Sequence, residues 1–217
     1  MQRLPSPRTT TTRCVVRLVP LRPSALSAAT RAQCQQQRAA AGRLWTALVQ
    51  QHAAARAQEQ WLSAGDLERV TKGGQYALQR HSVQALRQKC AANVATATEL
   101  RRQEFAETGR IETEYPHHPK PYQMVVWKDQ ALQVMPDGQL RLPCGGQRPP
   151  LLLPLPLPQE YRTAHLRRAE LLWRADHYEL ALTLATGSCV PDPLASGGGE
   201  EVVAARRWWR LGASRRW

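Results

Sequence analysis

Acidic residues are missing from the first 58 positions, which contain nine arginines and no aspartate or glutamate. Up to residue 110 there are 17 basic and 6 acidic side chains, a net charge of +11, whereas residues 111–217 carry a net charge of only +2. The whole chain of 217 residues has a formal charge of +13 and a pI of about 10.4. A polyanion is therefore expected to bind the first half of the chain. The alternative, that arginine is simply a general soluble residue here, accounts for many arginines but not for the missing acids.

Cysteine is scarce and scattered, at Cys14, Cys34, Cys90, Cys144 and Cys189. No two of them form a CxxC pair and their number is odd, which argues against a disulfide framework and against a zinc site. Reduced thiols in the cytoplasm are the expectation that fits this pattern. Long apolar runs are missing too: no stretch reaches the ~20 residues of a membrane span, and the N-terminus has no apolar signal-peptide core.

The spacing of apolar residues predicts an α+β fold that begins with a strand. Residues 1–12 are polar and contain prolines, so a disordered lead is expected there. Residues 13–20 alternate with a period of two, and Pro20 and Pro23 are expected to end this strand. A single strand is not stable alone, so its partners must come from later in the chain. The expected faces of the strand are Cys14, Val16 and Leu18 on one side and Arg13, Val15 and Arg17 on the other.

Residues 21–108 are expected to form an inserted helical lobe. Helix-forming Ala, Gln, Arg and Leu dominate from Ser24 to about Gln60. A second helical pattern follows Gly73–Gly74, and Gly109 ends it. Its apolar positions step by three and four, and they are Val83, Leu86, Cys90, Val94, Ala97 and Leu100. The other face suits either a solvated surface or one that meets phosphate groups, and it carries Arg80, Arg87, Lys89, Arg101 and Arg102.

The period changes to two after Gly109, and residues 109–186 are expected to complete a small antiparallel β-barrel with the first strand. Asp137–Gly138 is a strong hairpin-turn signal, and Ala175–His177 is the expected turn of a second hairpin. Trp127 and Trp173 alternate with apolar neighbours and are expected in the core. The expected strands are Tyr122–Trp127, Ala131–Met135, Gln139–Leu142, an edge segment within Pro149–Pro158, Ala169–Arg174 and Tyr178–Ala185.

Within residues 187–217, three glycines precede the sequence RRWWRLGASRRW. Basic residues beside Trp208, Trp209 and Trp217 are a combination that can stack on bases. The segment has no period and no cap, however, and exposed tryptophans on a tail reduce solubility. The interpretation we favour is an aberrant, disordered tail read from an altered frame.

Six blocks stand in a characteristic order: RCVVRLVPLRPSALSAATRAQC, LQRHSVQALRQKCAANVATATELRR, YPHHPKPYQMVVWKDQAL, DGQLRL, QRPPLLLPLPLP and AELLWRADHYELALTL. Together they resemble the N-terminal half of the TnpB (OrfB) family, which are transposon-encoded relatives of the type V CRISPR effectors and are often called transposases. The resemblance covers about residues 13–186. It rests on the order of divergent blocks rather than on one short invariant motif.

The resemblance implies both a fold and a partner. In that family the first and later strands build a wedge-type β-barrel, and the intervening helices form a recognition lobe. The two parts hold a guide RNA and its hybrid with target DNA through backbone shape and charge, so RNA and DNA are the implied partners. Cleavage belongs to a later RuvC-like nuclease domain, where separated carboxylates hold two Mg²⁺ ions.

The chain departs from the family where the first catalytic carboxylate is expected. Soon after YELALTL the family continues into a strand with a G-h-D-x-G pattern (h apolar), whereas this chain continues ATGSCVPDPLASGGGEE. Asp192 lies between two prolines and Glu200–Glu201 follow glycines, so neither lies at the end of a buried strand. We expect a truncated relative that lacks the nuclease domain and has no catalytic residue, metal or cofactor of its own.

Nine basic residues are the candidate contacts to a nucleic-acid backbone: Arg13, Arg17, Arg43, Lys72, Arg80, Arg87, Lys89, Lys128 and Arg148. Two other patterns have a simpler explanation. His117–His118 lies near Glu112 and Glu114, a combination that could hold a metal. The flanking prolines instead favour a solvated loop, in which the two histidine rings point apart. Lys72–Gly74 is too short for a phosphate loop and is better explained as a helix break.

Non-catalytic binding of structured RNA or an RNA–DNA hybrid is the leading hypothesis. A second hypothesis is a nonfunctional pseudogene product that folds poorly and binds nothing specific, because its tail would leave a strand edge uncovered. A third is an active enzyme formed by self-association or with a separate nuclease chain. Mg²⁺-dependent cleavage by the purified chain would establish that third hypothesis.

Overall fold

The computed structural model describes residues 14–155 and 164–185. These residues belong to one compact unit, Cys14–Thr186. The expectations for residues 1–12, for Arg13 and for the tail at 187–217 concern positions outside the described residues. In chain order the elements are β1 (Cys14–Leu21), η1 (Pro23–Ala25), α1 (Ala28–Ala57), α2 (Ala64–Thr71), α3 (Arg80–Thr108), β2 (Val125–Lys128), η2 (Asp129–Ala131), β3 (Gln133–Val134), β4 (Gln139–Leu142), β5 (Leu151–Pro154), β6 (His165–Arg174) and β7 (His177–Ala185).

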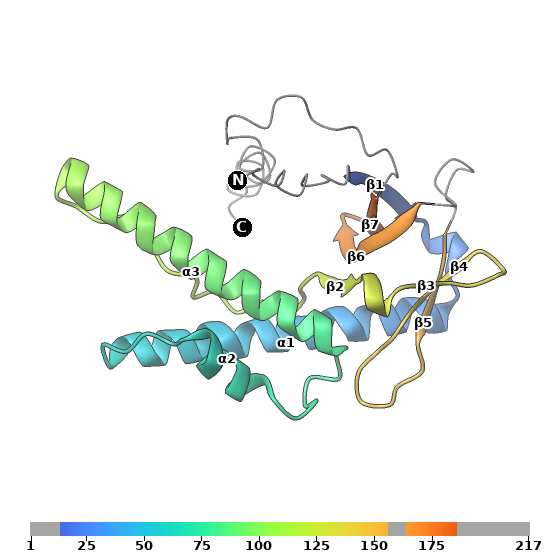
Figure 1. Cartoon of the computed structure of the whole chain (residues 1–217), viewed down its shortest axis with the longest axis horizontal. Helices are drawn as coiled ribbons and strands as arrows, with labels where there is room; N and C mark the ends of the chain where they lie inside the picture. Colours follow the sequence, from blue (N-terminus) through green and yellow to red (C-terminus); the bar gives the residue numbers. More distant parts are fainter. Residues whose placement is uncertain (1–13, 156–163, 186–217) are drawn as a thin grey trace, which may run out of the picture. The chain divides into compact units, whose positions relative to one another are not determined.

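Two long helices, α1 and α3, confirm the helical stretches expected between Ser24 and Gly109, and they pack against each other (Figure 1). Ser27 caps α1, because its hydroxyl oxygen accepts a hydrogen bond from the Thr30 amide at 3.0 Å. Gly109 ends α3 in the left-handed conformation, with φ of 68°, as its position predicts.

The hydrophobic periodicity does not predict the short helix α2. This helix begins with a capping box, in which the Asp66 amide donates to the Ser63 hydroxyl at 3.2 Å and the Ser63 amide donates to the Asp66 carboxylate at 2.7 Å. This S-x-x-D pattern is the signal that could have located the helix. Gly73 and Gly74, both with positive φ, follow α2, so the helix break predicted at Lys72–Gly74 is confirmed.

β1 pairs antiparallel with β7, which confirms that the first strand finds its partner late in the chain. The larger sheet has the order β1-β7-β6-β2, with β1 and β2 at its edges. β6 and β7 form the predicted hairpin, with its turn at Ala175 and Asp176. The sheet therefore joins the two ends of the described chain.

The alternation predicted for β1 is confirmed, since Cys14, Val16 and Leu18 share one face and it is exposed, but the strand runs one residue past Pro20, to Leu21. Val19 and Leu21 lie opposite buried residues of β7 and are buried with them. Val16, on the other face with Leu18, is 59% exposed. Alternation within one strand cannot show which face meets the core, because the pairing register decides this. Proline has no backbone N–H to donate. Pro20 is tolerated because β1 is an edge strand, and one side of an edge strand forms no hydrogen bonds to a neighbouring strand.

The predicted closed barrel is not formed by the residues that the structure describes. They form two separate antiparallel sheets, the four-stranded one and a second with the order β3-β4-β5. β4 and β5 have four residues each and β3 has two, which is too short to continue hydrogen bonding around a barrel. Pro149, Pro150 and Pro154 also lack the amide N–H that a longer β5 ladder would need. The coarser prediction, an α+β fold with antiparallel sheets, is confirmed.

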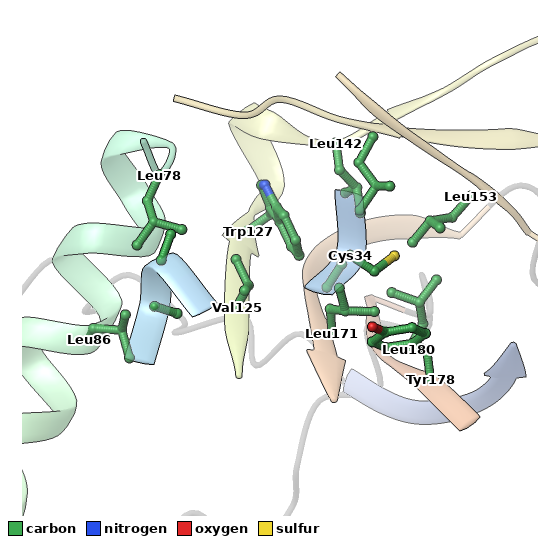
Figure 2. Close-up of a cluster of buried hydrophobic side chains, with 14 of the residues drawn as sticks. Cys34, Leu78, Leu86, Val125, Trp127, Leu142, Leu153, Leu171, Tyr178 and Leu180 are labelled. Atoms are coloured by element: carbon green, nitrogen blue, oxygen red, sulfur yellow. The ribbon is translucent and has the colours of Figure 1, made fainter. Parts of the chain in front are cut away.

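Both sheets share one hydrophobic core with α1 and α3, and Figure 2 shows side chains from these elements converging. Trp127 of β2 is fully buried, as predicted, and its Nε1 donates to the Pro143 carbonyl at 2.9 Å. Trp173, also predicted in the core, is instead 42% exposed. It lies one residue from the end of β6, beside the hairpin turn, where the sheet no longer covers it.

A buried hydrogen bond connects α3 to β2, in which the Ser82 hydroxyl donates to the Val126 carbonyl at 2.6 Å. Ser82→Ala would leave this carbonyl without its partner, which is expected to lower the free energy of unfolding by about 1–3 kcal/mol. Urea denaturation should show a lower midpoint with an unchanged slope. Ser24→Ala, at an exposed position of η1, is the control and should match the wild type. A Ser82→Ala midpoint equal to that of the wild type would contradict this prediction.

Candidate nucleic-acid interface

The outer face of the four-stranded sheet is the side opposite the buried side chains of β7. Successive side chains of a strand point to opposite faces, and cross-strand neighbours share a face. Arg168 and Glu170 of β6 lie opposite Thr183 and Ala181 of β7, which alternate with its buried leucines, so both lie on the outer face. Lys128 of β2 is the neighbour of Arg168 across the next pair of strands. α3 packs against β2 and brings its own side chains to this region.

Four cations gather here, and we call Lys89, Lys120, Lys128 and Arg168 the basic cluster. Lys128 and Arg168 are paired by strand register. Lys89 of α3 interacts electrostatically with Arg168 and with Lys120, which lies in the segment before β2. Its ammonium group is 3.4 Å from the Met124 sulfur. The sequence predicts Lys89 and Lys128 as contacts, whereas Lys120 and Arg168 are not predicted.

Positive charge exceeds negative charge in the basic cluster. Glu170 lies beside these cations and already forms an ion pair of 2.6 Å with Nε of Arg168. Asp129, which follows Lys128, lies 3.5 Å from Arg167. Burial lowers the pKa of Lys89, and the charge of Lys120 lowers it further, against the opposing effect of Glu170. The cations therefore repel one another, and an anion that binds between them would relieve this repulsion.

Three of the other predicted residues surround the α2–α3 connection. Arg87 is only 18% exposed and forms an ion pair of 3.4 Å with Glu68, so it joins α3 to α2. Lys72 directly follows α2 and Arg80 begins α3, and both are exposed. The charge of Arg87 is thus already engaged within the protein.

The remaining predicted residues lie apart from these. Arg43 is exposed on α1, and Arg17 is exposed on β1. Arg148 follows β4 and lines a pocket of about 590 Å³ with α1 residues that include Gln33 and Gln36. Of the predicted residues that the structure describes, Lys89 and Lys128 are therefore the two that it brings together in the basic cluster.

Arg38 of α1 is a cation that the sequence analysis does not single out. Its guanidinium carbon lies 5.4 Å from the ring centre of Tyr122 and 5.9 Å from those of Trp173 and Tyr178. Burial lowers the pKa of Arg38, and Tyr178 opposes this effect. Cation–π contacts of this kind hold α1 against the β6–β7 hairpin. Because the rings come from distant segments, no local signal in the sequence points to them.

His117 and His118 lie close together, which corrects the expectation that their rings point apart. The ring centres are 3.8 Å apart at an interplanar angle of 42°. The reason is a bend at Pro116, since only a fully extended chain separates adjacent side chains. Both rings are exposed, and His117 lies 3.5 Å from Glu114. Within residues 14–155 and 164–185, no three His, Cys, Asp or Glu side chains converge as a metal site requires.

Two thiols, Cys34 of α1 and Cys90 of α3, are buried, and they are expected to resist alkylation in the folded protein. Burial raises the pKa of Cys34 to about 12 and that of Cys90 to about 11, from an ordinary value of 9.0. The reactive thiolate is therefore rare at pH 8. The contribution of the protonated thiols to the free energy of unfolding is present below pH 9 and is lost as the pH rises toward 12. Mass spectrometry after iodoacetamide treatment should find both modified in urea but not without it. Equal modification in the two conditions would contradict this burial.

In the part of the chain that the structure describes, no helix combines the length and the apolar character needed to cross a membrane. Comparison with known proteins provides no family assignment: no family model matches the chain, and no curated protein matches it. A function is therefore inferred from the residues of this chain and their geometry.

Proposed function

We propose that this chain binds structured RNA or an RNA–DNA hybrid through the basic cluster and does not cleave it. The observation that carries the proposal is the gathering of Lys89, Lys120, Lys128 and Arg168 around Glu170, whose charge Arg168 already engages. Lysine and arginine side chains on one face can contact several phosphate groups of a backbone. Such contacts supply affinity without reading base sequence.

The order of the elements supports the same proposal. One strand, then helices, then further strands is the order that the resemblance to the TnpB family implies. We propose that the two sheets correspond to the wedge part of that family, and that α1, α2 and α3 correspond to its recognition lobe. The basic cluster contains residues of both α3 and the larger sheet, so an A-form duplex bound there would touch both parts.

Binding without cleavage is supported by what the described carboxylates do. Two-metal hydrolysis needs carboxylates that converge on two ions about 4 Å apart. Here several carboxylates are instead paired with arginines near them in the chain: Asp66 with Arg69, Glu99 with Arg102, Glu170 with Arg168 and Glu179 with Arg174. Mg²⁺ added to the complex with a labelled RNA–DNA hybrid is expected to leave the probe intact. A shortened product would overturn this part of the proposal.

Filter binding of a labelled RNA–DNA hybrid over a range of salt concentrations tests the binding itself. For a duplex, each phosphate contact contributes about −0.9 to the slope of log affinity against log salt concentration, so four contacts predict a slope of about −3 to −4. Hybrids of different sequence are expected to bind with similar affinity, because backbone contacts carry no sequence information. A slope near zero would reject the proposal.

A further inference from the structure

A second group of cationic and aromatic side chains lies where α1 ends, and it shares no residue with the basic cluster. A pocket of about 550 Å³ is lined here by Arg56, Trp61, Arg101, Glu114, Tyr115 and His117, and we call it the Tyr115 pocket. Its volume falls within the range of sites that hold small ligands. Trp61, which lies between α1 and α2, is 57% exposed, so much of its ring is open to solvent.

Two guanidinium groups lie over the ring of Tyr115. The guanidinium carbon of Arg56 is 4.2 Å from the ring centre, and that of Arg101 is 4.9 Å from it. Trp61 meets the same ring at 5.5 Å between centres, with an interplanar angle of 65°. Cation–π contacts orient guanidinium groups while their N–H bonds remain able to bind an anion.

The walls of the pocket are held in place from three sides. An Nη of Arg101 donates to the Thr113 carbonyl at 2.6 Å, and Nε of Arg56 donates to the His52 carbonyl at 3.4 Å. The Trp61 ring also meets the buried His52 ring at 6.0 Å and 72°. These contacts fix the side chains before any ligand binds, which reduces the entropy lost on binding.

The segment that carries Tyr115 is anchored to α3 by Glu104. The carboxylate of Glu104 accepts hydrogen bonds from the Glu112 amide at 3.0 Å and from the Thr113 amide at 2.9 Å. It also accepts one from the Thr113 hydroxyl. These donors engage the Glu104 carboxylate and, together with the nearby charge of Arg101, lower its pKa. Glu114 on the rim lies 3.5 Å from His117.

We infer that the Tyr115 pocket binds one unpaired nucleotide of a single-stranded RNA segment. The exposed face of Trp61 stacks on the base, and Arg56 and Arg101 bind the adjacent phosphate group. An open aromatic face beside two arginines is the combination that single-strand binding sites use. An acidic peptide would match the arginines but would leave the Trp61 face without a planar partner. This inference goes beyond the proposed function, because it does not require the basic cluster.

A short single-stranded RNA that contains the fluorescent base 2-aminopurine tests the inference. Stacking on Trp61 is expected to quench its fluorescence as the wild-type protein is added. Trp61→Ala should weaken binding by at least about fivefold, the lower end of what loss of one stacking contact causes. Trp61→Phe keeps a ring and should retain most of the affinity. Because Trp61 is largely exposed, both variants are expected to fold, which a thermal melt by circular dichroism verifies.

Arginine variants separate the pocket from general charge effects. Arg101→Gln is expected to weaken binding of the same RNA, whereas Arg102→Gln, which removes an equal charge from the exposed neighbour that pairs with Glu99, should not. Equal affinities of Trp61→Ala, Arg101→Gln and the wild type would overturn the inference. Competition by a polyglutamate peptide as effective as that by unlabelled RNA would overturn it too. A variant of the basic cluster that loses the RNA–DNA hybrid but still quenches 2-aminopurine distinguishes this site from the proposed interface.

Discussion

Gly42→Ala is expected to lower the free energy of unfolding by about 3 kcal/mol, because a methyl group at this position would overlap backbone atoms. A Cβ on Gly42 would lie 2.5 Å from the Pro121 carbonyl carbon and 2.6 Å from the Lys120 carbonyl oxygen. Backbone cannot rotate away as a long side chain can, so either α1 or the segment at Lys120–Pro121 must shift. Thermal and urea denaturation of the two proteins would measure the loss.

Gly42 lies in the interior of α1, where glycine destabilises the helix by about 1 kcal/mol relative to alanine. Close approach offsets that cost: the Lys120 amide donates to the Thr46 hydroxyl at 3.1 Å, and the Gln123 amide donates to the Arg38 carbonyl at 3.1 Å. These bonds hold the segment that carries Lys120 of the basic cluster against α1. Gly42→Ala is therefore also expected to weaken RNA binding.

Gly65→Ala is the matched control. Gly65 lies in α2, where the nearest atom to an added Cβ is the Ser63 hydroxyl oxygen at 3.7 Å, an ordinary contact. Alanine should be neutral or slightly stabilising there, because it favours the helix more than glycine does. If Gly42→Ala melted at or above the wild-type temperature, the close approach of α1 and Pro121 would be wrong. A wild-type melt without cooperativity would favour the hypothesis of a poorly folded product.

Much of the fold follows from local patterns. The helical spacing between Ser24 and Gly109, the glycine that ends α3 and the alternation in β7 each depend on neighbours within a few residues. The face of β1 does not, because β1 pairs with a strand at the far end of the described chain. Val16 and Leu18 are as apolar as Val19 and Leu21, and only the register with β7 determines which pair is buried.

The candidate site is less predictable than the fold for the same reason. Lys89 and Lys128 can be picked out from the sequence, because Lys89 lies in a predicted helix and Lys128 directly follows a predicted strand. Lys120 joins them because Gly42 lets its segment approach α1, and Arg168 joins them through the register of β6 with β2. Neither relation has a signal in short windows of sequence. The same holds for Tyr115, whose contacts come from three separate segments.

The double variant Lys89→Gln with Lys128→Gln is expected to bind the RNA–DNA hybrid about 50-fold more weakly than the wild type at about 0.1 M salt, because two phosphate contacts are lost. The slope of log affinity against log salt concentration should become less steep by about 2. Glutamine keeps part of the aliphatic length of lysine, and both side chains are half-buried rather than fully buried, so the variant is expected to fold. The measurement is the salt titration by filter binding, with folding verified by circular dichroism.

Glu170→Gln should have the opposite effect, and this difference in sign separates the basic cluster from a general effect of net charge. Glu170 engages Nε of Arg168 at 2.6 Å, so its neutralisation releases that guanidinium for a phosphate and steepens the salt dependence. Arg69→Gln removes one positive charge from an exposed pair on α2 and should leave the slope unchanged. Screening makes distant surface charges weak at about 0.1 M salt, so only side chains near the bound backbone change the slope appreciably. Affinity could instead fall in proportion to the lost charge alone, so that the single variant Arg69→Gln loses half as much binding free energy as the double variant at Lys89 and Lys128. In that case the outer face would not be the interface.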